Sequence, residues 1–579
     1  MSNRGISGTD DVAARLARIT LRQPTLPAPH HLGQDWPGMV LAEHQAALDE
    51  ATVGGARIVA VQMADREARR ALLADWVRRH AVQFPGGQLY FDMHDVRRDG
   101  AGDPAVMLAR LLRSLGVWEE FIPPRFADRV HALQRVAAQR RCVIVVDGVS
   151  LMPEAAVAAC PEGMLLVGSH RPVDGLRLHG DAACLNLESP ASPREDLDAL
   201  VSSLPTSARA LYRLLGHLPA PTIGPVLAHA LLDSAGERAI RELKDVGLLV
   251  PAGMPGRSRL REQALTHARD RAMAEPSGDR LRALRQITDV CLQVVEEAAA
   301  TCTSPDADDA ARWAALEVLD AEQHTVTLLM QTITHAQWHR KVWRLAMALR
   351  PLYDARVYES YWQESHTLGV EAALWDGAID VQAELRTQLA RLELLCGYPD
   401  NPERAEKALA SAQEMLTLVS SDRLRGLIWQ TLAELEEARD RDSVPAWQQA
   451  RHWYTQAQEQ GQADAAMATA RLGQALVAAG SAEEALAVLN GAAGPSGAHA
   501  DLVRAAAYRA LEQHGPALSA AVDAAEHAAH HARYRPYSTA LTLVAELAGE
   551  FQDEELLQMC RGKERELEAA SIGIGRLGR

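Results

Sequence analysis

The sequence predicts an α/β fold followed by an all-α region, on two observations. First, short apolar segments alternate with helical ones between residues 57 and 187, which is the pattern of a parallel sheet covered on both faces. Second, the chain from residue 278 onward is alanine-rich and nearly all helical in pattern, and Gly480 and Gly515 lie 35 residues apart. This interval is close to the tetratricopeptide period of about 34 residues and predicts a C-terminal α-solenoid.

The composition is that of a folded protein without a general affinity for polyanions. Of the 579 residues, 47% are hydrophobic and 23% charged, and the formal net charge is −16. We therefore expect no electrostatic attraction to nucleic acid or to an anionic membrane. No membrane span or signal peptide is evident. The seven cysteines are scattered without C-x-x-C pairs, which indicates reduced thiols and a cytoplasmic location.

Changes of pattern along the chain predict five segments. Residues 1–35 contain one short helical stretch followed by prolines and are expected to form an N-terminal arm. The other four segments are an α/β nucleotide-binding-like domain at 36–190, a helical and winged-helix module at 191–277, a helical arm at 278–440, and tetratricopeptide-like repeats with a C-terminal tail at 441–579.

The α/β domain is expected to contain a short series of buried strands separated by helices. The predicted strands are residues 57–61, 88–92, 142–147, 164–169 and 183–187. The predicted helices are residues 42–52, 104–115 and 128–139, with a further amphipathic helix that carries Ala71, Leu72 and Trp76 on one face.

The turn between the first strand and its helix decides whether this domain can bind a nucleotide. A phosphate-binding loop reads G-x-x-x-x-G-K-[ST] here, because glycine amides wrap the phosphates and the lysine reaches their oxygens. In this chain residues 62–67 are Gln, Met, Ala, Asp, Arg and Glu, and the first lysine is Lys244. Arg66, Arg69 and Arg70 supply charge but not the close backbone approach that glycine permits. Conventional ATP hydrolysis is not expected, and two carboxylates stand where phosphates would lie.

Asp147 ends an apolar strand at the position where ATPases of this topology carry a magnesium-binding carboxylate. The alternative is that Asp147 only caps the strand-to-loop transition. The missing phosphate loop favours this alternative.

The segment after residue 192 has the order of a winged-helix module. Helices are predicted at residues 208–216, 223–234 and 237–246, followed by a hairpin of residues 248–250 and 257–260. DNA recognition would need a basic helix on the exposed face. The third helix has mixed charge, so a packing role is the better interpretation.

The concave face of a helical solenoid usually binds a peptide or protein segment. The candidate contact residues on the inner helices of the two clearest repeats are Arg471, Gln474, Arg504 and Tyr508. Three histidines at residues 527, 530 and 531 have helical spacing and could bind zinc. Because no nearby cysteine completes a ligand set, we expect a polar solenoid face and no metal.

Taken together, this layout resembles the NB-ARC branch of the STAND signalling ATPases, in particular bacterial regulators that join an NB-ARC module to tetratricopeptide repeats. The resemblance extends from about residue 24 to residue 531. The segments that carry it are residues 88–92, 111–116, 141–148, 165–171, 208–216 and 344–352.

The departures from this family fall on the nucleotide site. Family members carry a Gly-Arg pair before the first helix, where residues 40–43 are Val, Leu, Ala and Glu. The arginine expected after the fourth strand is His170, with Arg171 one position late, and the ADP-sensing His-Asp pair is Arg261-Glu262. The resemblance therefore implies a pseudo-NTPase whose vestigial nucleotide site would include Asp147, Arg171 and Arg261.

Three hypotheses follow. The first is a non-catalytic regulatory or scaffold protein, without a cofactor, that binds a protein or peptide through its repeats. The second is a STAND switch that still binds ATP or ADP with magnesium in an altered mode. The third is a DNA-binding transcriptional regulator that uses the winged helix. Assembly into a homo-oligomer is left open by all three.

Overall fold

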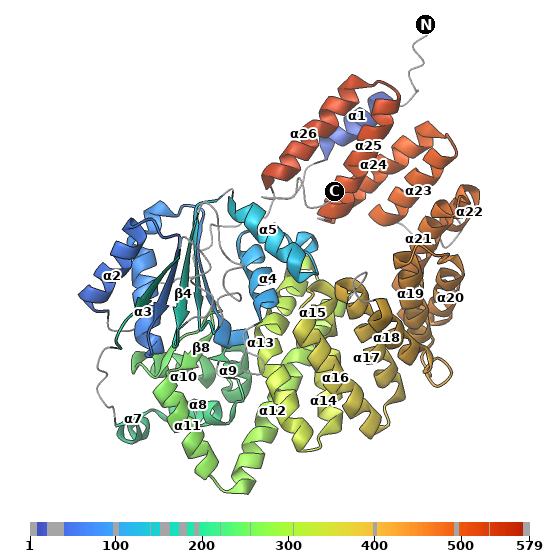
Figure 1. Cartoon of the computed structure of the whole chain (residues 1–579). Coiled ribbons are helices and arrows are strands. Elements are labelled where there is room, and N and C mark those ends of the chain that lie inside the picture. The colour runs from blue at the N-terminus through green and yellow to red at the C-terminus, as the bar shows by residue number, and fades with distance from the viewer. Residues whose placement is uncertain are drawn as a thin grey trace. The chain divides into compact units, whose positions relative to one another are not determined.

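The elements fall into two groups with their own cores (Figure 1). The computed structural model of the chain describes residues 9–19, 40–96, 103–138, 140–150, 163–172, 182–189, 196–220, 222–254, 256–304, 306–397, 402–490, 497–531 and 533–570. The first group, the α/β unit, lies within residues 26–115 and 122–376, and the second, the helical unit, within residues 1–25, 116–121 and 377–579. Among the described helices, none has the length and apolar character needed to cross a lipid bilayer.

A parallel sheet forms the centre of the α/β unit. In the described residues its strands follow the order β2-β3-β4-β1-β5. Their bounds are β1 (Ile58–Gln62), β2 (Gly87–Asp92), β3 (Cys142–Asp147), β4 (Met164–Ser169) and β5 (Ala182–Asn186). Every residue of β2 and β3 is buried, which explains their continuous apolar sequence. The predicted strands and their parallel pairing are confirmed.

Helices cover both faces of this sheet (Figure 1). They are α2 (Ala42–Val53), α3 (Arg66–Arg79), α4 (Pro104–Ser114) and α5 (Phe126–Ala138). The fully buried Trp76 of α3 packs in a core with Leu48 of α2 and with Tyr90 and Leu166 of the sheet. The predicted apolar face of α3 is therefore the face that binds α3 to the sheet.

Short helices and a small antiparallel sheet follow. The helices are α7 (Leu197–Ser203), α8 (Thr206–His217), α9 (Pro225–Leu232), α10 (Ala235–Asp245) and α11 (Glu262–Ala274). The strands pair in the order β6-β8-β7, with β6 (Thr222–Ile223), β7 (Leu249–Pro251) and β8 (Ser258–Leu260). The predicted hairpin and the three helices before it are present. Their assignment to the winged-helix class stays a prediction.

The helices that follow complete the described part of the α/β unit. They are α12 (Ser277–Thr303), α13 (Asp309–His335), α14 (His339–Ala348), α15 (Arg350–Ala355) and α16 (Glu359–Asp376). Arg257, which precedes β8, donates to Glu322 of α13 at 2.5 Å, and both side chains are buried. This ion pair joins the small sheet to the long helix.

Antiparallel helix pairs make up most of the helical unit. The helices are α17 (Ile379–Leu392), α18 (Pro402–Gln413), α19 (Asp422–Ala438), α20 (Val444–Gln456), α21 (Gln462–Ala478), α22 (Ala482–Leu489), α23 (Ala498–Ala510), α24 (His514–His530), α25 (Tyr534–Glu550) and α26 (Glu554–Ala570). A helix also comes from the start of the chain, α1 (Thr9–Arg18), and packs on α24 and α26. The all-α region expected after the α/β domain is confirmed.

The turns within the helix pairs correct one detail of the predicted repeat. Gly480, with φ of 81°, does end a helix, but Gly515 lies in the first turn of α24. The turn before α24 is instead made by Glu512, with φ of 56°, and the equivalent turns use Asp440 and Gln552. Because three of these left-handed positions are not glycine, glycine spacing does not give the repeat length.

Candidate functional site

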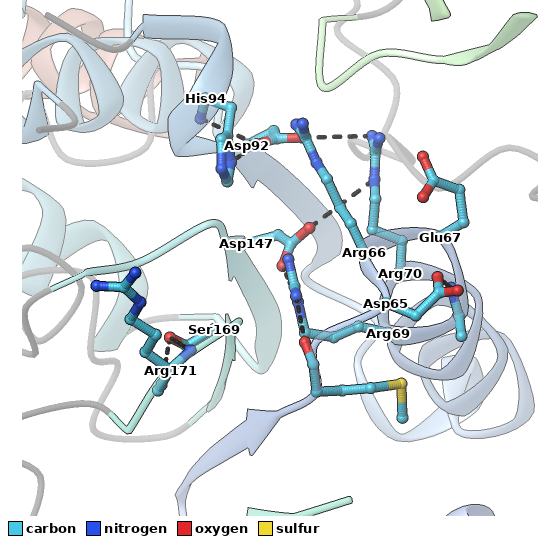
Figure 2. A network of polar contacts seen from close by, with 12 residues as sticks. Asp65, Arg66, Glu67, Arg69, Arg70, Asp92, His94, Asp147, Ser169 and Arg171 are labelled. Atoms are coloured by element: carbon cyan, nitrogen blue, oxygen red, sulfur yellow. Dashed lines mark hydrogen bonds and ion pairs between the residues drawn. The ribbon is translucent and has the colours of Figure 1, made fainter. Parts of the chain in front are cut away.

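The sheet edge beside the start of α3 is the place where the predicted nucleotide site would lie. β2 and β3 end side by side in Asp92 and Asp147, which are register partners. α3 begins four residues after β1 and directs Arg66, Arg69 and Arg70 toward these two carboxylates (Figure 2). Three guanidinium groups and two carboxylates therefore meet where a nucleotide enzyme holds phosphate and magnesium.

Asp147 and Arg69 form the innermost contact of this cluster. Arg69 Nε donates to Asp147 Oδ1 at 2.7 Å, and the two side chains are 1% and 0% exposed. Arg69 Nη1 also donates to the carbonyl oxygen of Met63 at 2.7 Å, and the Tyr90 hydroxyl donates to Asp147 Oδ2 at 3.2 Å. Burial opposes ionisation of Asp147, but the charge and hydrogen bond of Arg69 together with the charge of Arg70 outweigh it and lower the pKa of the carboxyl. Asp147 is thus a buried ion-pair partner, whereas the sequence favoured a simple strand cap.

Asp92 holds the other two arginines. Arg66 Nη2 donates to Asp92 Oδ2 at 2.6 Å, and Arg70 Nη2 lies 3.6 Å from the same oxygen. The backbone amide of His94 donates to Asp92 Oδ1 at 3.0 Å. Although burial alone would raise it, the charges of Arg66 and Arg70 hold the pKa of Asp92 well below its usual range.

Side chains already occupy the polar groups at the start of α3. Asp65 accepts from the amide of Ala68 at 2.9 Å as the N-cap, and the amide of Asp65 donates to Ser189 Oγ at 2.8 Å. Glu67 lies 3.4 Å from Arg259. The two carboxylates predicted at the phosphate position are therefore used within the protein. A capped helix start has fewer free amides to offer an anion.

Arg259 lies close to the arginines of α3, so several positive charges are gathered here. Its side chain is buried, and burial, together with the charges of Arg70 and Arg66, lowers the pKa of Arg259 to about 10. Removal from water and nearby positive charges both lower the pKa of a guanidinium. This strand-β8 arginine is a member of the cluster that the sequence did not single out.

A small residue is required beneath the Arg69–Asp147 pair. A Cβ atom added to Gly168 of β4 would lie 2.1 Å from Asp147 Oδ1 and 3.0 Å from Arg69 Nε. Both atoms are fixed by the ion pair, so neither can move aside without breaking it. We infer that Gly168 is set by this packing rather than by a turn.

The substitution Gly168→Ala is expected to lower the free energy of unfolding by about 1–3 kcal/mol, the usual cost of overpacking a filled core. Urea denaturation followed by tryptophan fluorescence measures it. Gly549→Ala is the matched control, because a Cβ there meets nothing within 4 Å in α25. The control is expected to be neutral or slightly stabilising, since alanine favours helix over glycine by about 1 kcal/mol. Equal effects of the two substitutions would contradict this account of the site.

A solvent-accessible cavity of about 520 Å³ adjoins the cluster between the start of α3 and α11. Four of its lining residues are carboxylates, Asp65, Glu67, Glu262 and Asp270, and the basic ones are Arg66 and His267. Such a lining repels a polyphosphate more than it attracts one. The cavity is large enough for a small ligand, but its charge does not suit ATP.

The predicted partners of Asp147 lie apart from its ion pair. Arg171 is exposed, and its backbone is held by Ser169, whose Oγ donates to the Arg171 carbonyl at 2.7 Å. Arg261 is the N-cap residue of α11, and its amide donates to the carbonyl oxygen of Leu248 at 3.0 Å. The arginines bound to Asp147 and Asp92 come from α3 instead.

The predicted contact residues of the solenoid all have partners within the helical unit. Arg471 lies 2.7 Å from Glu437 and 3.0 Å from Gln474. Arg504 donates to Asp501 at 2.6 Å and to Asn490 at 3.0 Å, and Asn490 in turn contacts the Tyr508 hydroxyl at 3.5 Å. Their role toward another protein stays a prediction. His527 is paired with Asp501 at 2.6 Å.

Solved structures, but no family model or curated protein, are similar to this chain. The chain is similar to the crystal structure of a STAND protein with a tetratricopeptide repeat sensor from Pyrococcus horikoshii, with 12% identity and a TM-score of 0.44, over 92% of this chain and 91% of that one. It is also similar to a circular tandem repeat protein, with 16% identity and a TM-score of 0.16, over 63% of this chain and 84% of that one.

Proposed function

We propose that this chain is a non-catalytic regulatory or scaffold protein whose nucleotide-binding-like core is a pseudo-NTPase. The observation that carries the proposal is the pairing of Arg66 and Arg69 with Asp92 and Asp147. In a working site such carboxylates must be free for magnesium and the cations free for phosphate. Here they neutralise one another.

The stability of these ion pairs also disfavours nucleotide binding. Separating a buried ion pair costs roughly 3–5 kcal/mol, and a bound phosphate would have to replace that loss before any net affinity appeared. The backbone gives little in return, because Asp65 caps α3 and no glycine-rich loop surrounds the site. The helix pairs of the helical unit supply the proposed binding function, since stacked helical repeats present extended surfaces to protein segments.

Nucleotide titration tests the proposal. Isothermal titration of ATP or ADP with magnesium into the full chain is expected to give no saturable heat up to about 1 mM, which corresponds to a binding free energy of only ~4 kcal/mol. Turnover of ATP is expected to be absent in the same samples. Affinity capture with the full chain is then expected to retain a protein partner equally well with and without ATP.

The second candidate is a nucleotide-binding switch with an altered site. It is favoured by the closely spaced Arg66, Arg70 and Arg259, whose positive charges a bound anion could compensate, although the cavity beside α3 is lined mostly by carboxylates. Micromolar binding of either nucleotide, or partner capture that depends on ATP, would replace the first proposal with this one. The DNA-binding alternative has no such support in the geometry, since α10 carries mixed charge.

A further inference from the structure

The first described helix of the chain packs on the last helix pairs, and we call the surface of α24 and α26 that it covers the α24–α26 groove. α1 packs on α24 and α26 within the helical unit (Figure 1). Val12, Leu16 and Ile19 are all buried there. Their spacing of four and three residues places them on one side of a helix, which is the anchor pattern of a helix bound in a groove.

Charge fixes the position of this helix. Arg15 Nη2 lies 2.5 Å from Asp523 and 2.6 Å from Glu526, and Arg15 Nε donates to the other oxygen of Glu526 at 3.0 Å. Both carboxylates belong to α24 and keep 43% and 41% of their side chains exposed. The groove therefore presents two carboxylates to one basic side chain, and apolar residues pack on either side of that side chain.

The end of α1 is also recognised. Lys563 Nζ of α26 donates to the carbonyl oxygen of Ile19 at 2.8 Å. A cation at a helix C-terminus satisfies a carbonyl left without a partner and favours the helix dipole. The groove thus has a surface for three features of a bound helix. These are a row of apolar residues, a basic residue beside them, and a C-terminal carbonyl oxygen that can accept from Lys563.

α1 is a short helix. α1 has 10 residues, and isolated helices shorter than about 12–15 residues are marginal in water. Its order consequently depends on the groove, and release of α1 is a local unfolding event rather than a global one. Any helix with the same pattern on a partner protein meets the same donors, acceptors and apolar surface.

We propose that the α24–α26 groove is a docking site for an amphipathic helix of a partner protein, and that α1 occupies it in cis as a competing ligand. This inference rests on the proposed scaffold function and names the partner as a helical segment with apolar residues at positions i, i+4 and i+7 and a basic residue at i+3. While α1 occupies the groove, a partner helix cannot bind there until α1 is released.

The test measures binding of a fluorescein-labelled peptide of residues 9–19 to the full chain by fluorescence polarisation. In the variant Leu16→Asp the tethered helix should leave the groove. Because a tethered competitor acts at roughly millimolar effective concentration, its removal is expected to strengthen peptide binding by at least about tenfold. Ala17→Asp is the matched control, since residue 17 is exposed in α1, and that variant is expected to bind the peptide as the wild type does.

The charge requirement is tested on the same variant. An Arg15→Glu peptide is expected to bind the Leu16→Asp chain at least about fivefold more weakly, and the Glu526→Arg substitution in the groove should recover part of the loss. Circular dichroism and a thermal melt of each chain show that the helix pairs remain folded.

Three outcomes would overturn the inference. One is equal peptide affinity for wild-type and Leu16→Asp chains, and another is indifference to the charge of residue 15. The third is a wild-type dimer that Leu16→Asp converts to a monomer, because α1 would then bind a second copy. Nucleotide titration is independent of all three, so the proposed function and this inference can fail separately.

Discussion

Replacing Asp320 by alanine is expected to lower the free energy of unfolding of the α/β unit by about 3–5 kcal/mol, because the buried Arg110 loses its counter-charge and Arg356 keeps only Glu317. The Asp320 side chain is 3% exposed and accepts from Arg110 at 3.0 Å, from Arg356 at 2.5 Å and from the Tyr358 hydroxyl at 2.7 Å. Arg113 lies 3.6 Å away. One carboxylate thus joins α4, α13 and the chain before α16.

Urea denaturation followed by tryptophan fluorescence measures this loss. Asp309→Ala is the matched control, since Asp309 lies on the same helix and its side chain is 88% exposed beside Arg312. Its effect is expected to stay within about 0.5 kcal/mol, as for most exposed substitutions. A loss of similar size at both positions would mean that the cluster around Asp320 adds little to stability.

The same residue predicts an acid dependence with a definite sign. Burial disfavours the charged form of Asp320, but the charges of Arg110, Arg113 and Arg356 prevail and lower its pKa. A depressed folded-state pKa contributes stability that is full above the unfolded value, near 3.9, and is lost as the pH falls below it. Unfolding of the wild type should therefore become easier from about pH 4 downward, and Asp320→Ala should flatten this part of the curve.

Asp147→Ala is the second substitution with a large expected effect, again a loss of about 3–5 kcal/mol. It would strand Arg69, which is 1% exposed. Arg69→Met alone should be costly as well, because the buried Asp147 would then keep only the more distant Arg70, at 3.9 Å. The double variant is expected to lose less than the sum of the two, since replacing both partners removes the uncompensated charge.

This cycle separates a structural pair from a ligand site. A carboxylate kept for magnesium usually costs stability, so its removal tends to stabilise a protein. Denaturation of the four chains measures the coupling between the residues. Additive losses, or a more stable Asp147→Ala chain, would contradict the ion-pair account and return Asp147 to the role of a ligand.

Much of the sheet could be predicted from sequence because its central strands are buried on both faces. Residues 142–147 are apolar until Asp147, and the predicted strand coincides with β3. The loss of the phosphate loop is likewise visible in residues 62–67. The sequence could not show the ion pair between Arg69 and Asp147, because the two residues are 78 positions apart and no local pattern links them.

Other features were hidden by residue type. Within two turns, α13 buries several polar side chains, among them Asp320, Glu322, Gln323 and Thr325. The sequence of its inner face is therefore not apolar. The turns at Asp440, Glu512 and Gln552 take a left-handed backbone that sequence rules assign to glycine or asparagine. α1 also has an amphipathic pattern, but its partners lie more than 500 residues later in the chain, with Arg15 and Glu526 separated by 511 positions.

The place of β1 in the sheet governs the order in which a new chain can fold. β1 is made first among the described strands, yet its neighbours are β4 and β5, and Ile58 pairs with Leu165 and Ala182. During synthesis from the N-terminus, β1 and the apolar face of α3 must wait until these residues leave the ribosome. Parallel pairing over such separations in sequence is slow, and unpaired strands of incompletely folded chains can aggregate with one another. Production of this protein should therefore benefit from low temperature and abundant chaperones.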